Sequence, residues 1–172
     1  MTIATKSVEL QQGTVNYREA GTGDPMLFVH GLLVNGRLWD PAVEHLRKDF
    51  RCIVPDWPLG SHRVPMKPDA DLSTPALADL VAGFIGELGL EKVTLVGNDT
   101  GGAICQLVAT RHPDAIGRLV LTNCDMYEIF PPKMFAYLGL LARVPGGLAM
   151  AAQSQRIKPL RRSPVDLAND AR

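Results

Sequence analysis

The sequence predicts an α/β fold in which a mostly parallel sheet is flanked by helices. Short apolar, β-branched runs alternate along the chain with longer segments of helical periodicity. Polar residues follow the ends of several of these apolar runs, as they do at the ligand-binding edge of such sheets. With 172 residues, 46% of them hydrophobic, the chain has enough apolar material for the core of one ordinary domain.

The charge balance excludes several classes of partner. Lysine plus arginine and aspartate plus glutamate both number 18, so no overall field favours nucleic acid or a membrane surface. A basic cluster near the C-terminus is better explained as a solvated face or tail than as a polyanion site. Its members are Arg156, Lys158, Arg161 and Arg162. No signal-peptide pattern or apolar run of membrane-spanning length is present, which predicts a cytoplasmic protein.

The three cysteines, Cys52, Cys105 and Cys124, are widely spaced and form no metal-ligand pattern. Cys52 and Cys124 lie in apolar strand-like runs, which predicts buried thiols in a reducing compartment. We expect neither a metal nor a cofactor.

The first third of the chain predicts a hairpin, two buried strands and a helix. Two extended runs split by Gln11-Gln12-Gly13 indicate an antiparallel hairpin, and two continuous apolar runs indicate strands buried on both faces. A segment of helical periodicity separates the two buried strands. The ranges are 8–10 and 14–20 for the hairpin, 26–29 and 52–54 for the buried strands, and 38–48 for the helix.

A loop rich in proline and polar residues, 57–73, is expected to precede a second helix. Ser73 is placed to cap that helix, and Pro75 lies in its first turn. The inward-facing stripe of the helix is predicted to consist of Leu77, Leu80, Val81, Phe84 and Leu88. A further buried strand is expected at 119–122.

The most informative stretch runs from residue 92 to residue 112. A strand over 93–96 and a helix after it enclose Gly97-Asn98-Asp99-Thr100-Gly101. The central residue of so sharp a strand-to-helix turn is strained, and small residues are needed two positions before and after it. The spacing predicts Asp99 as a nucleophile, and Gly102 lets the helix lie close to the sheet. Alternatively, Asp99 is only the N-cap of the helix, although a cap alone does not require both glycines.

Four polar residues, His30, Asp56, Asp99 and Asp125, each follow a predicted strand. In a parallel sheet the carboxyl ends of the strands meet at one edge, so these residues are expected to converge there. His30 and Asp56 are interpreted as supports of their loops rather than as reacting groups. Asp125 is either a catalytic acid or a turn residue.

The pattern changes after Pro131-Pro132. Helices are predicted over 133–144 and 148–154, interrupted by Pro145-Gly146-Gly147, and the remainder is polar and weakly periodic. We therefore expect a core at 1–130 and a separate helical segment with an irregular tail at 131–172.

These motifs together resemble the α/β-hydrolase superfamily. The resemblance rests on His30-Gly31, on Asp56 followed by Gly60-Ser61, and on the stretch from Gly97 to Gly102, and it runs from about residue 8 to residue 135. An aspartate at the nucleophile position resembles the branch of haloalkane dehalogenases and epoxide hydrolases. The resemblance implies the α/β-hydrolase fold, with residues from 131 on starting a helical cap.

The resemblance also implies a mechanism. Asp99 attacks an electrophilic carbon of a small hydrophobic substrate, and a histidine-activated water then hydrolyses the resulting ester. Backbone N–H groups of Thr100 and, by resemblance, Leu32 form the oxyanion hole. Gly31 belongs to the loop that carries Leu32. Asp125 matches a position that some family members use for the acid that orients the histidine.

The chain departs from this pattern in two ways. Haloalkane dehalogenases carry side-chain N–H donors for the halide where this chain has Leu32 and Thr100, while Tyr137 is a candidate proton donor for epoxide opening. None of the four histidines follows a late strand, and the sheet is expected to be incomplete on its C-terminal side. Three interpretations stay open: a hydrolase with its remaining parts elsewhere, an inactive truncated fragment, or a relative of serine-type esterases. The open sheet edge predicts self-association.

Overall fold

The computed structural model describes residues 5–124, 140, 141 and 143–154. The chain divides into two compact units, Met1–Phe130 and Pro131–Arg172, and each is described by itself. The division falls where the sequence pattern changes.

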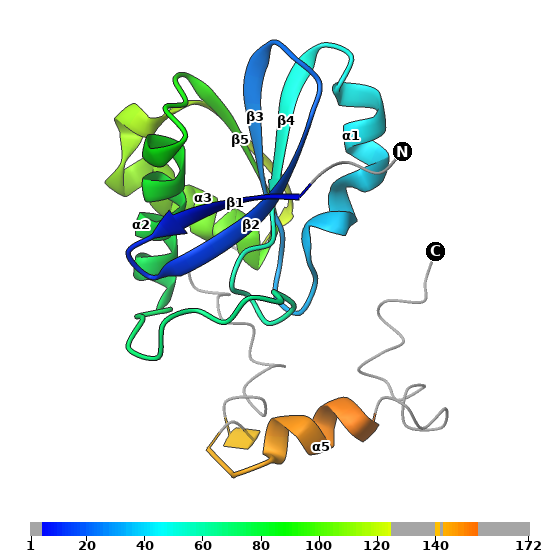
Figure 1. Ribbon diagram of the computed structural model, residues 1–172, viewed down its shortest axis with the longest axis vertical. Helices are drawn as coiled ribbons and strands as arrows, with labels where there is room; N and C mark the ends of the chain where they lie inside the picture. The colour runs from blue at the N-terminus through cyan, green and yellow to red at the C-terminus, as the bar shows by residue number, and fades with distance from the viewer. Residues whose placement is uncertain (1–4, 125–139, 142, 155–172) are drawn as a thin grey trace. The chain divides into compact units, whose positions relative to one another are not determined.

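The first unit is built on a six-stranded sheet with the order β1-β2-β4-β3-β5-β6 (Figure 1). The pairs β1–β2 and β2–β4 are antiparallel, whereas β4, β3, β5 and β6 run parallel to one another. The strands are β1 (Thr5–Leu10), β2 (Gly13–Ala20), β3 (Asp24–Val29), β4 (Phe50–Pro55), β5 (Val93–Asp99) and β6 (Ile116–Cys124). The predicted hairpin and the mostly parallel sheet are confirmed.

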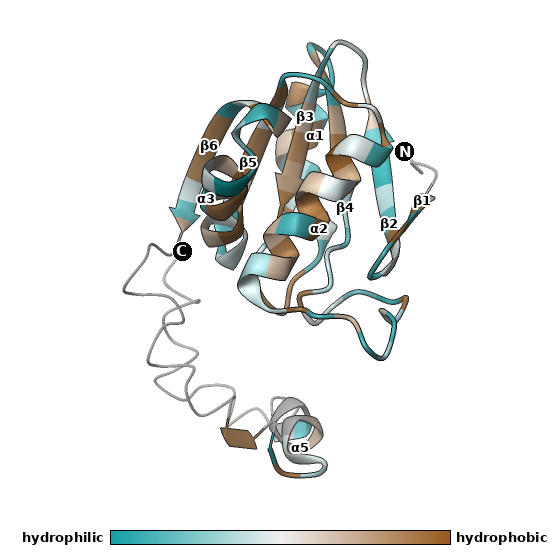
Figure 2. Cartoon of the chain, turned by 90° about the vertical axis from the view of Figure 1, so that its left-hand side faces the viewer, coloured by the Kyte–Doolittle hydropathy of each residue, from teal (hydrophilic) through white to brown (hydrophobic). Residues whose placement is uncertain are grey.

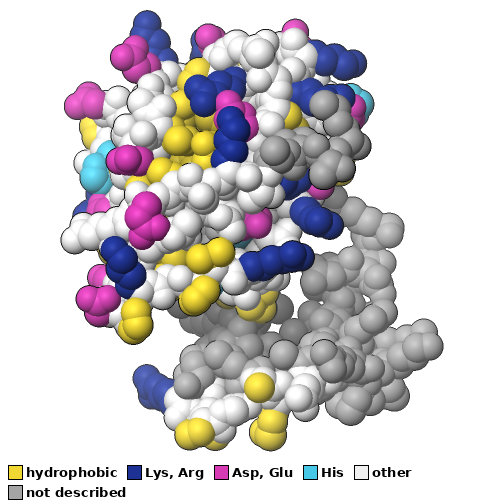
Figure 3. Space-filling model, in the orientation of Figure 1, with side chains coloured by type: hydrophobic (Ala, Val, Ile, Leu, Met, Phe, Trp, Pro, Cys, Tyr) yellow, Lys and Arg dark blue, Asp and Glu magenta, His cyan; other side chains and the backbone are white. Residues whose placement is uncertain are grey.

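Helices connect the parallel strands. They are the 3₁₀ helix η1 (Gly36–Trp39), α1 (Asp40–Leu46), α2 (Thr74–Glu87), α3 (Thr100–Arg111) and the 3₁₀ turn η2 (Pro113–Ala115). The helix predicted over 38–48 is thus a 3₁₀ turn that passes into α1. Charged side chains of both signs are intermixed on the face of this unit shown in Figure 3, in keeping with their equal numbers.

The central strands are buried on both faces, because successive side chains of each strand enter two different cores. On the face covered by α2 and α3, Leu27, Ile53 and Leu95 lie fully buried in one cluster. On the opposite face, Phe28 and Val96 pack with the side chains of η1 and α1 in a second cluster. Figure 1 shows α2 and α3 on one side of the central strands and α1 on the other, and Figure 2 shows the hydrophobic colour of β3 and β5. Double burial explains why these strands appear in the sequence as continuous apolar runs.

The apolar residues predicted to face inward from α2 pack into the larger core. Leu77, Leu80, Val81 and Phe84 are buried there, while Leu88 packs at its margin. The predicted cap is wrong in one respect: Ser73 occupies the N-cap position, but its side chain makes no capping hydrogen bond. The backbone N–H of Ser73 instead donates to Oδ1 of Asp71 at 2.8 Å, so the turn before the helix is stabilised locally.

The thiols differ in burial. Cys52 and Cys105 are fully buried, and burial raises the pKa of both. The prediction that Cys124 is buried is wrong, because Cys124 ends the outermost strand of the described sheet and is half-buried. All three cysteines are free.

In the second unit the described helix is α5 (Gly147–Ser154), which matches the helix predicted over 148–154. Gly146 precedes it with φ 77°, a conformation that favours glycine. Most of the helix predicted over 133–144, the tail from 155, Asp125 and Tyr137 lie outside the described residues. In the described part of the chain, no helix has the length and apolar character needed to cross a membrane.

Candidate active site

Asp99 lies at the turn between a buried strand and a helix, with no loop residues between the two elements. Strand β5 runs as far as Asp99, and α3 begins at the next residue, Thr100. The backbone of Asp99 has φ 53° and ψ −132°, a region that L-residues rarely adopt. Such strain costs on the order of 1–3 kcal/mol and persists where the surrounding structure enforces it, often at functional sites.

The glycines on either side of Asp99 lie where a larger side chain would clash with neighbouring atoms. A Cβ on Gly97 would stand 2.7 Å from Cα of Gly102, and one on Gly101 would stand 2.5 Å from the carbonyl oxygen of His30. A Cβ on Gly102 would stand 2.9 Å from Sγ of Cys124. Each distance is shorter than Cβ atoms tolerate, so the first turn of α3 can pack against β3, β5 and β6 only with glycine at these positions.

The carboxylate of Asp99 does not cap the helix. Asp99 occupies the N-cap position of α3, but its side chain makes no capping hydrogen bond. It lies instead against Gly31, where an added Cβ would stand 2.7 Å from Cγ of Asp99. The structure therefore brings together the end of β5 and the loop after β3.

Each of the two residues predicted to supply oxyanion-hole donors follows a member of this contact in the chain, Thr100 after Asp99 and Leu32 after Gly31. Thr100 is buried at the first position of α3, where backbone N–H groups have no partner within a helix. Leu32 follows Gly31 and has 40% of its surface exposed. The positive end of the α3 dipole is adjacent to Asp99.

His30 connects the loops after β3 and β4. The side chain is fully buried, and its Nε2 accepts a hydrogen bond from the backbone N–H of Trp57 at 2.9 Å. Its Nδ1 lies 2.9 Å from the carbonyl oxygen of Gly31, so the ring proton is assigned to Nδ1. Burial lowers the pKa of His30 despite the hydrogen bond to Gly31, and the ring is neutral.

The same two loops are joined at further points. Oδ1 of Asp56 accepts from the backbone N–H of Gly36 at 2.9 Å. The backbone N–H of Leu33 donates to the carbonyl of Leu59 at 2.8 Å, and Oγ of Ser61 donates to the carbonyl of Leu33 at 2.8 Å. His30 and Asp56 therefore lie in the contacts that hold the loop carrying Gly31 and Leu32.

Comparison with known proteins places this geometry in a family. Residues 24–153 match the family described as the alpha/beta hydrolase fold. The chain belongs to the alpha/beta hydrolase family.

Individual relatives agree with that assignment. Haloalkane dehalogenase 2 of Mycobacterium tuberculosis is 31% identical over 134 residues, which make up 78% of this chain and 46% of the relative. The solved N-acyl homoserine lactonase AidH has a TM-score of 0.65 and 28% identity, with 72% of this chain and 46% of that protein covered. Epoxide hydrolase CorEH has a TM-score of 0.70 over 88% of this chain and 56% of its own, and at 20% identity it supports the fold alone. The chain spans less than half the length of the curated relatives it matches.

The sequence pattern did not single out one residue beside the candidate nucleophile, Asn98. Nδ2 of Asn98 donates to the carbonyl oxygen of Thr122 in β6 at 2.9 Å, and Oγ1 of Thr122 donates to the carbonyl of Gly97 at 3.2 Å. The strand register shifts between Asn98 and Asp99 at this point, and Asn123 has φ 40°. Asn98 thus ties the strained turn to the neighbouring strand. In the sequence, the only sign of this role is that a residue with a side-chain amide, Asn98, directly precedes the candidate nucleophile.

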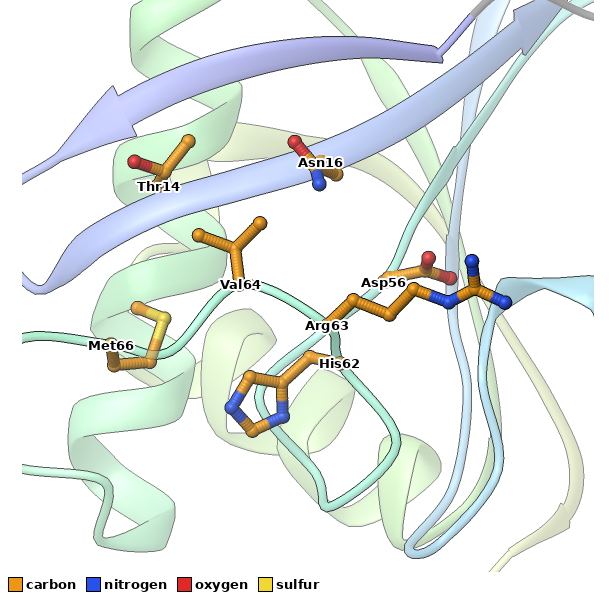
Figure 4. A pocket seen from close by; sticks show the side chains of 7 residues that line it. All are labelled: Thr14, Asn16, Asp56, His62, Arg63, Val64 and Met66. Atoms are coloured by element: carbon orange, nitrogen blue, oxygen red, sulfur yellow. The ribbon is translucent and has the colours of Figure 1, made fainter.

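All four histidines of the chain lie among the described residues. Both ring nitrogens of His30 are engaged, and Nε2 of His112 lies 2.7 Å from an aspartate of α2. His45 is exposed on α1. His62 lines a small polar pocket between β2 and the loop after β4, which Asp99 does not line (Figure 4).

Proposed function

We propose that this chain forms the nucleophile-bearing part of a hydrolase in which Asp99 attacks an electrophilic carbon of a small hydrophobic substrate. The observation that carries the proposal is the strained backbone of Asp99, with a carboxylate that caps nothing and lies against Gly31. A residue that served only as a cap would gain a hydrogen bond from this position, and Asp99 gains none.

The first step forms a C–O bond between a carboxylate oxygen of Asp99 and the substrate carbon. In a haloalkane the carbon–halogen bond breaks and the electron pair leaves with the halide. In an epoxide a ring C–O bond breaks and the pair stays on the ring oxygen, which then takes a proton from solvent water and leaves hydroxide. Both routes leave the substrate carbon esterified to Asp99.

The second step is attack of water on the carbonyl carbon of that ester. The negative charge that develops on the carbonyl oxygen requires preorganised N–H donors, and we assign these to the backbone of Leu32 and Thr100. Regeneration of Asp99 also needs a base to deprotonate the water. Among the residues that the structure describes, no hydrogen bond joins a histidine to Asp99, and the ring nitrogens of His30 are already hydrogen-bonded. The ester is therefore expected to accumulate.

The experiment is intact-mass spectrometry of the chain after incubation with a primary bromoalkane, with styrene oxide and with an aryl acetate. A bromoalkane adds its alkyl group less one hydrogen, whereas an epoxide adds its whole mass, so the two first steps are distinguishable. We expect one adduct per chain, mapped to Asp99 by peptide sequencing and released by hydroxylamine. Asp99→Asn removes the adduct, whereas Asp49→Asn at an exposed loop position does not.

Two results would contradict the proposal, and a third would contradict the single-turnover expectation. No adduct with any of the three substrates would refute Asp99 as a nucleophile. An adduct at another carboxylate would do so as well. Multiple turnovers abolished by Asp99→Ala would show that the chain contains a working base and would refute the single-turnover expectation.

A further inference from the structure

The loop after β3 contains a leucine in the left-handed backbone conformation. Leu33 has φ 63°, a region that residues other than glycine, asparagine and aspartate rarely adopt. Such a conformation persists only where the surrounding structure enforces it. Leu33 directly follows Leu32, whose backbone N–H is assigned to the oxyanion hole. The contacts that hold Leu33 therefore bear on the direction of that donor.

Three consecutive peptide units of this loop are each held by one hydrogen bond. In the first unit, the carbonyl oxygen of Gly31 accepts from Nδ1 of His30 at 2.9 Å. In the second unit, the N–H of Leu33 donates to the carbonyl oxygen of Leu59 at 2.8 Å. In the third unit, the carbonyl oxygen of Leu33 accepts from Oγ of Ser61 at 2.8 Å. The orientation of each unit is thus fixed by a partner outside it.

The first of these units contains the assigned donor. The carbonyl of Gly31 and the N–H of Leu32 belong to one planar trans peptide, in which they point in opposite directions. The hydrogen bond from His30 to that carbonyl therefore directs the Leu32 N–H away from the imidazole. A rotation of this peptide has to be taken up by the dihedral angles on both sides of it. On the C-terminal side the two hydrogen bonds of Leu33 oppose such a change.

Ser61 is the member of this set that a substitution can remove alone. The His30 ring also holds the loop after β4 through its second nitrogen, and Leu59 acts through its backbone carbonyl. Ser61 contributes a single hydroxyl. The loop lies close to Leu33 at this point, because a Cβ on the preceding Gly60 would stand 3.0 Å from Cδ2 of Leu33. Ser61→Ala therefore deletes one hydrogen bond and leaves the chain path in place.

We propose that Ser61 is a positioning residue of the oxyanion hole. Its hydroxyl holds Leu33 in the left-handed conformation and thereby keeps the Leu32 N–H directed at the oxygen on which negative charge develops. This inference rests on the proposed function of Asp99 and adds to it a residue that acts through Leu33.

The role of Ser61 differs between the two chemical steps. When Asp99 is alkylated, negative charge leaves the carboxylate with the leaving group, so the oxyanion-hole donors do not lower that barrier. When the ester is attacked, negative charge builds up on its carbonyl oxygen, and a displaced donor raises the barrier. Loss of the Ser61 hydroxyl is therefore expected to slow the second step and to spare the first.

The test measures the two steps separately on the same chain. Esterification by a primary bromoalkane is followed by intact-mass spectrometry, and the adduct is then freed of reagent. Hydroxylamine is added to the folded adduct. Its nitrogen attacks the ester carbonyl of Asp99, the acyl C–O bond breaks, and the alkoxide takes the proton that the nitrogen loses. The alkyl group leaves as the alcohol and a hydroxamate stays on the chain. The same release in concentrated urea gives the rate without an oxyanion hole.

Ser61→Ala is expected to slow release from the folded chain on the order of tenfold, less than the ~100–1,000-fold loss that follows removal of a donor outright. The rate of esterification and the rate of release in urea should stay unchanged. Ser61→Thr keeps the hydroxyl and should restore release. Ser7→Ala is the matched control, because it makes the same change at an exposed position of β1.

A second measurement does not depend on the adduct. Hydrogen exchange followed by NMR reports the protection of the Leu33 amide, which donates to Leu59. Ser61→Ala is expected to speed this exchange on the order of fivefold, because one hydrogen bond that holds the residue is lost. Exchange at the buried Leu95 in β5 should stay at the wild-type rate, which shows that the variant is folded.

The outcomes separate this inference from the proposed function. Absence of an adduct in the wild type would refute the proposed function and this inference with it. An adduct that Ser61→Ala releases as fast as the wild type would overturn this inference alone. Equal slowing of both steps, unchanged exchange of the Leu33 amide, no recovery in Ser61→Thr, or the same loss in Ser7→Ala would overturn it as well.

Discussion

The carboxylate of Asp99 rests on the Cα of Gly31, where an added Cβ would stand 2.6 Å from Cβ and 2.7 Å from Cγ of Asp99. Gly31 does not have a positive φ, so its backbone conformation is open to any residue. Space alone requires glycine there. The position of the carboxylate therefore depends on the absence of a side chain in the loop after β3.

Gly31→Ala is expected to displace the Asp99 carboxylate and to slow formation of the covalent adduct. A misplacement of about 1 Å costs on the order of 100-fold in rate. Gly83→Ala is the control, since a Cβ on Gly83 in α2 meets no atom within 4 Å. The control should leave the adduct rate unchanged and stabilise the fold by about 0.5–1 kcal/mol. Equal adduct rates in Gly31→Ala and wild type would contradict the assigned contact.

Asp99→Gly is expected to raise the free energy of unfolding by about 1 kcal/mol, because glycine adopts φ 53° without strain. Asp99→Ala keeps the Cβ and the strain, so it should give no comparable gain. Urea denaturation of the two variants and the wild type measures the difference. If both variants have the same stability, the backbone of Asp99 is not strained in solution.

Asn98→Ala is expected to lower stability by about 1 kcal/mol, because the hydrogen bond to the carbonyl of Thr122 is lost. Asn98→Asp keeps the shape of the side chain but has no N–H to donate, and it should be at least as damaging. The adduct rate at Asp99 should fall in both variants. Wild-type stability and adduct rate in Asn98→Asp would show that the amide does not hold the turn.

Asp79 links α2 to the end of α3 and gives stability a dependence on pH. The hydrogen bond from His112 and then the guanidinium of Arg111 hold the pKa of Asp79 below its ordinary value of 3.8. A carboxylate whose pKa is lowered on folding contributes stability above that ordinary value, and the contribution is lost as the pH falls through the lowered pKa.

Asp79→Asn is accordingly expected to cost less than ~1 kcal/mol at pH 6, since the pair is exposed to solvent. The difference from wild type should close as the pH falls below 3.8. Chemical denaturation between pH 2 and pH 7 measures this stability difference, with Asp114→Asn as an exposed control. A difference that stays constant down to the lowest pH would rule out Asp79 as its source.

The strands, the helices and the turn at Asp99 were predictable because each depends on the pattern of residues close together in the sequence. Double burial of β3 and β5 leaves continuous apolar runs, and the close approach of α3 to its neighbours leaves glycines at fixed spacing. The fold class, the strand positions and the family resemblance followed from these signals and are confirmed. The catalytic roles of Asp99, Leu32, Thr100 and Asp125 stay predictions.

Contacts between distant segments were not predictable. The hydrogen bond between Asn98 and Thr122 depends on a register shift between β5 and β6, and spacing within one strand carries no information about it. The side chain of Ser73 does not cap α2, because the nearer backbone–carboxylate bond to Asp71 sets the turn. Cys124 is half-buried because burial depends on what lies beyond a strand as well as on its own residues.

The place of β3 in the sheet has a consequence for biosynthesis. Strand β3 hydrogen-bonds to β4 on one side and to β5 on the other, and β5 does not begin until Val93. At about 5–20 residues per second, a nascent chain leaving the ribosome exposes one edge of β3 for several seconds. Val29 and its apolar neighbours are then open to chaperones and to other nascent chains. Added chaperone is therefore expected to increase the yield of folded protein.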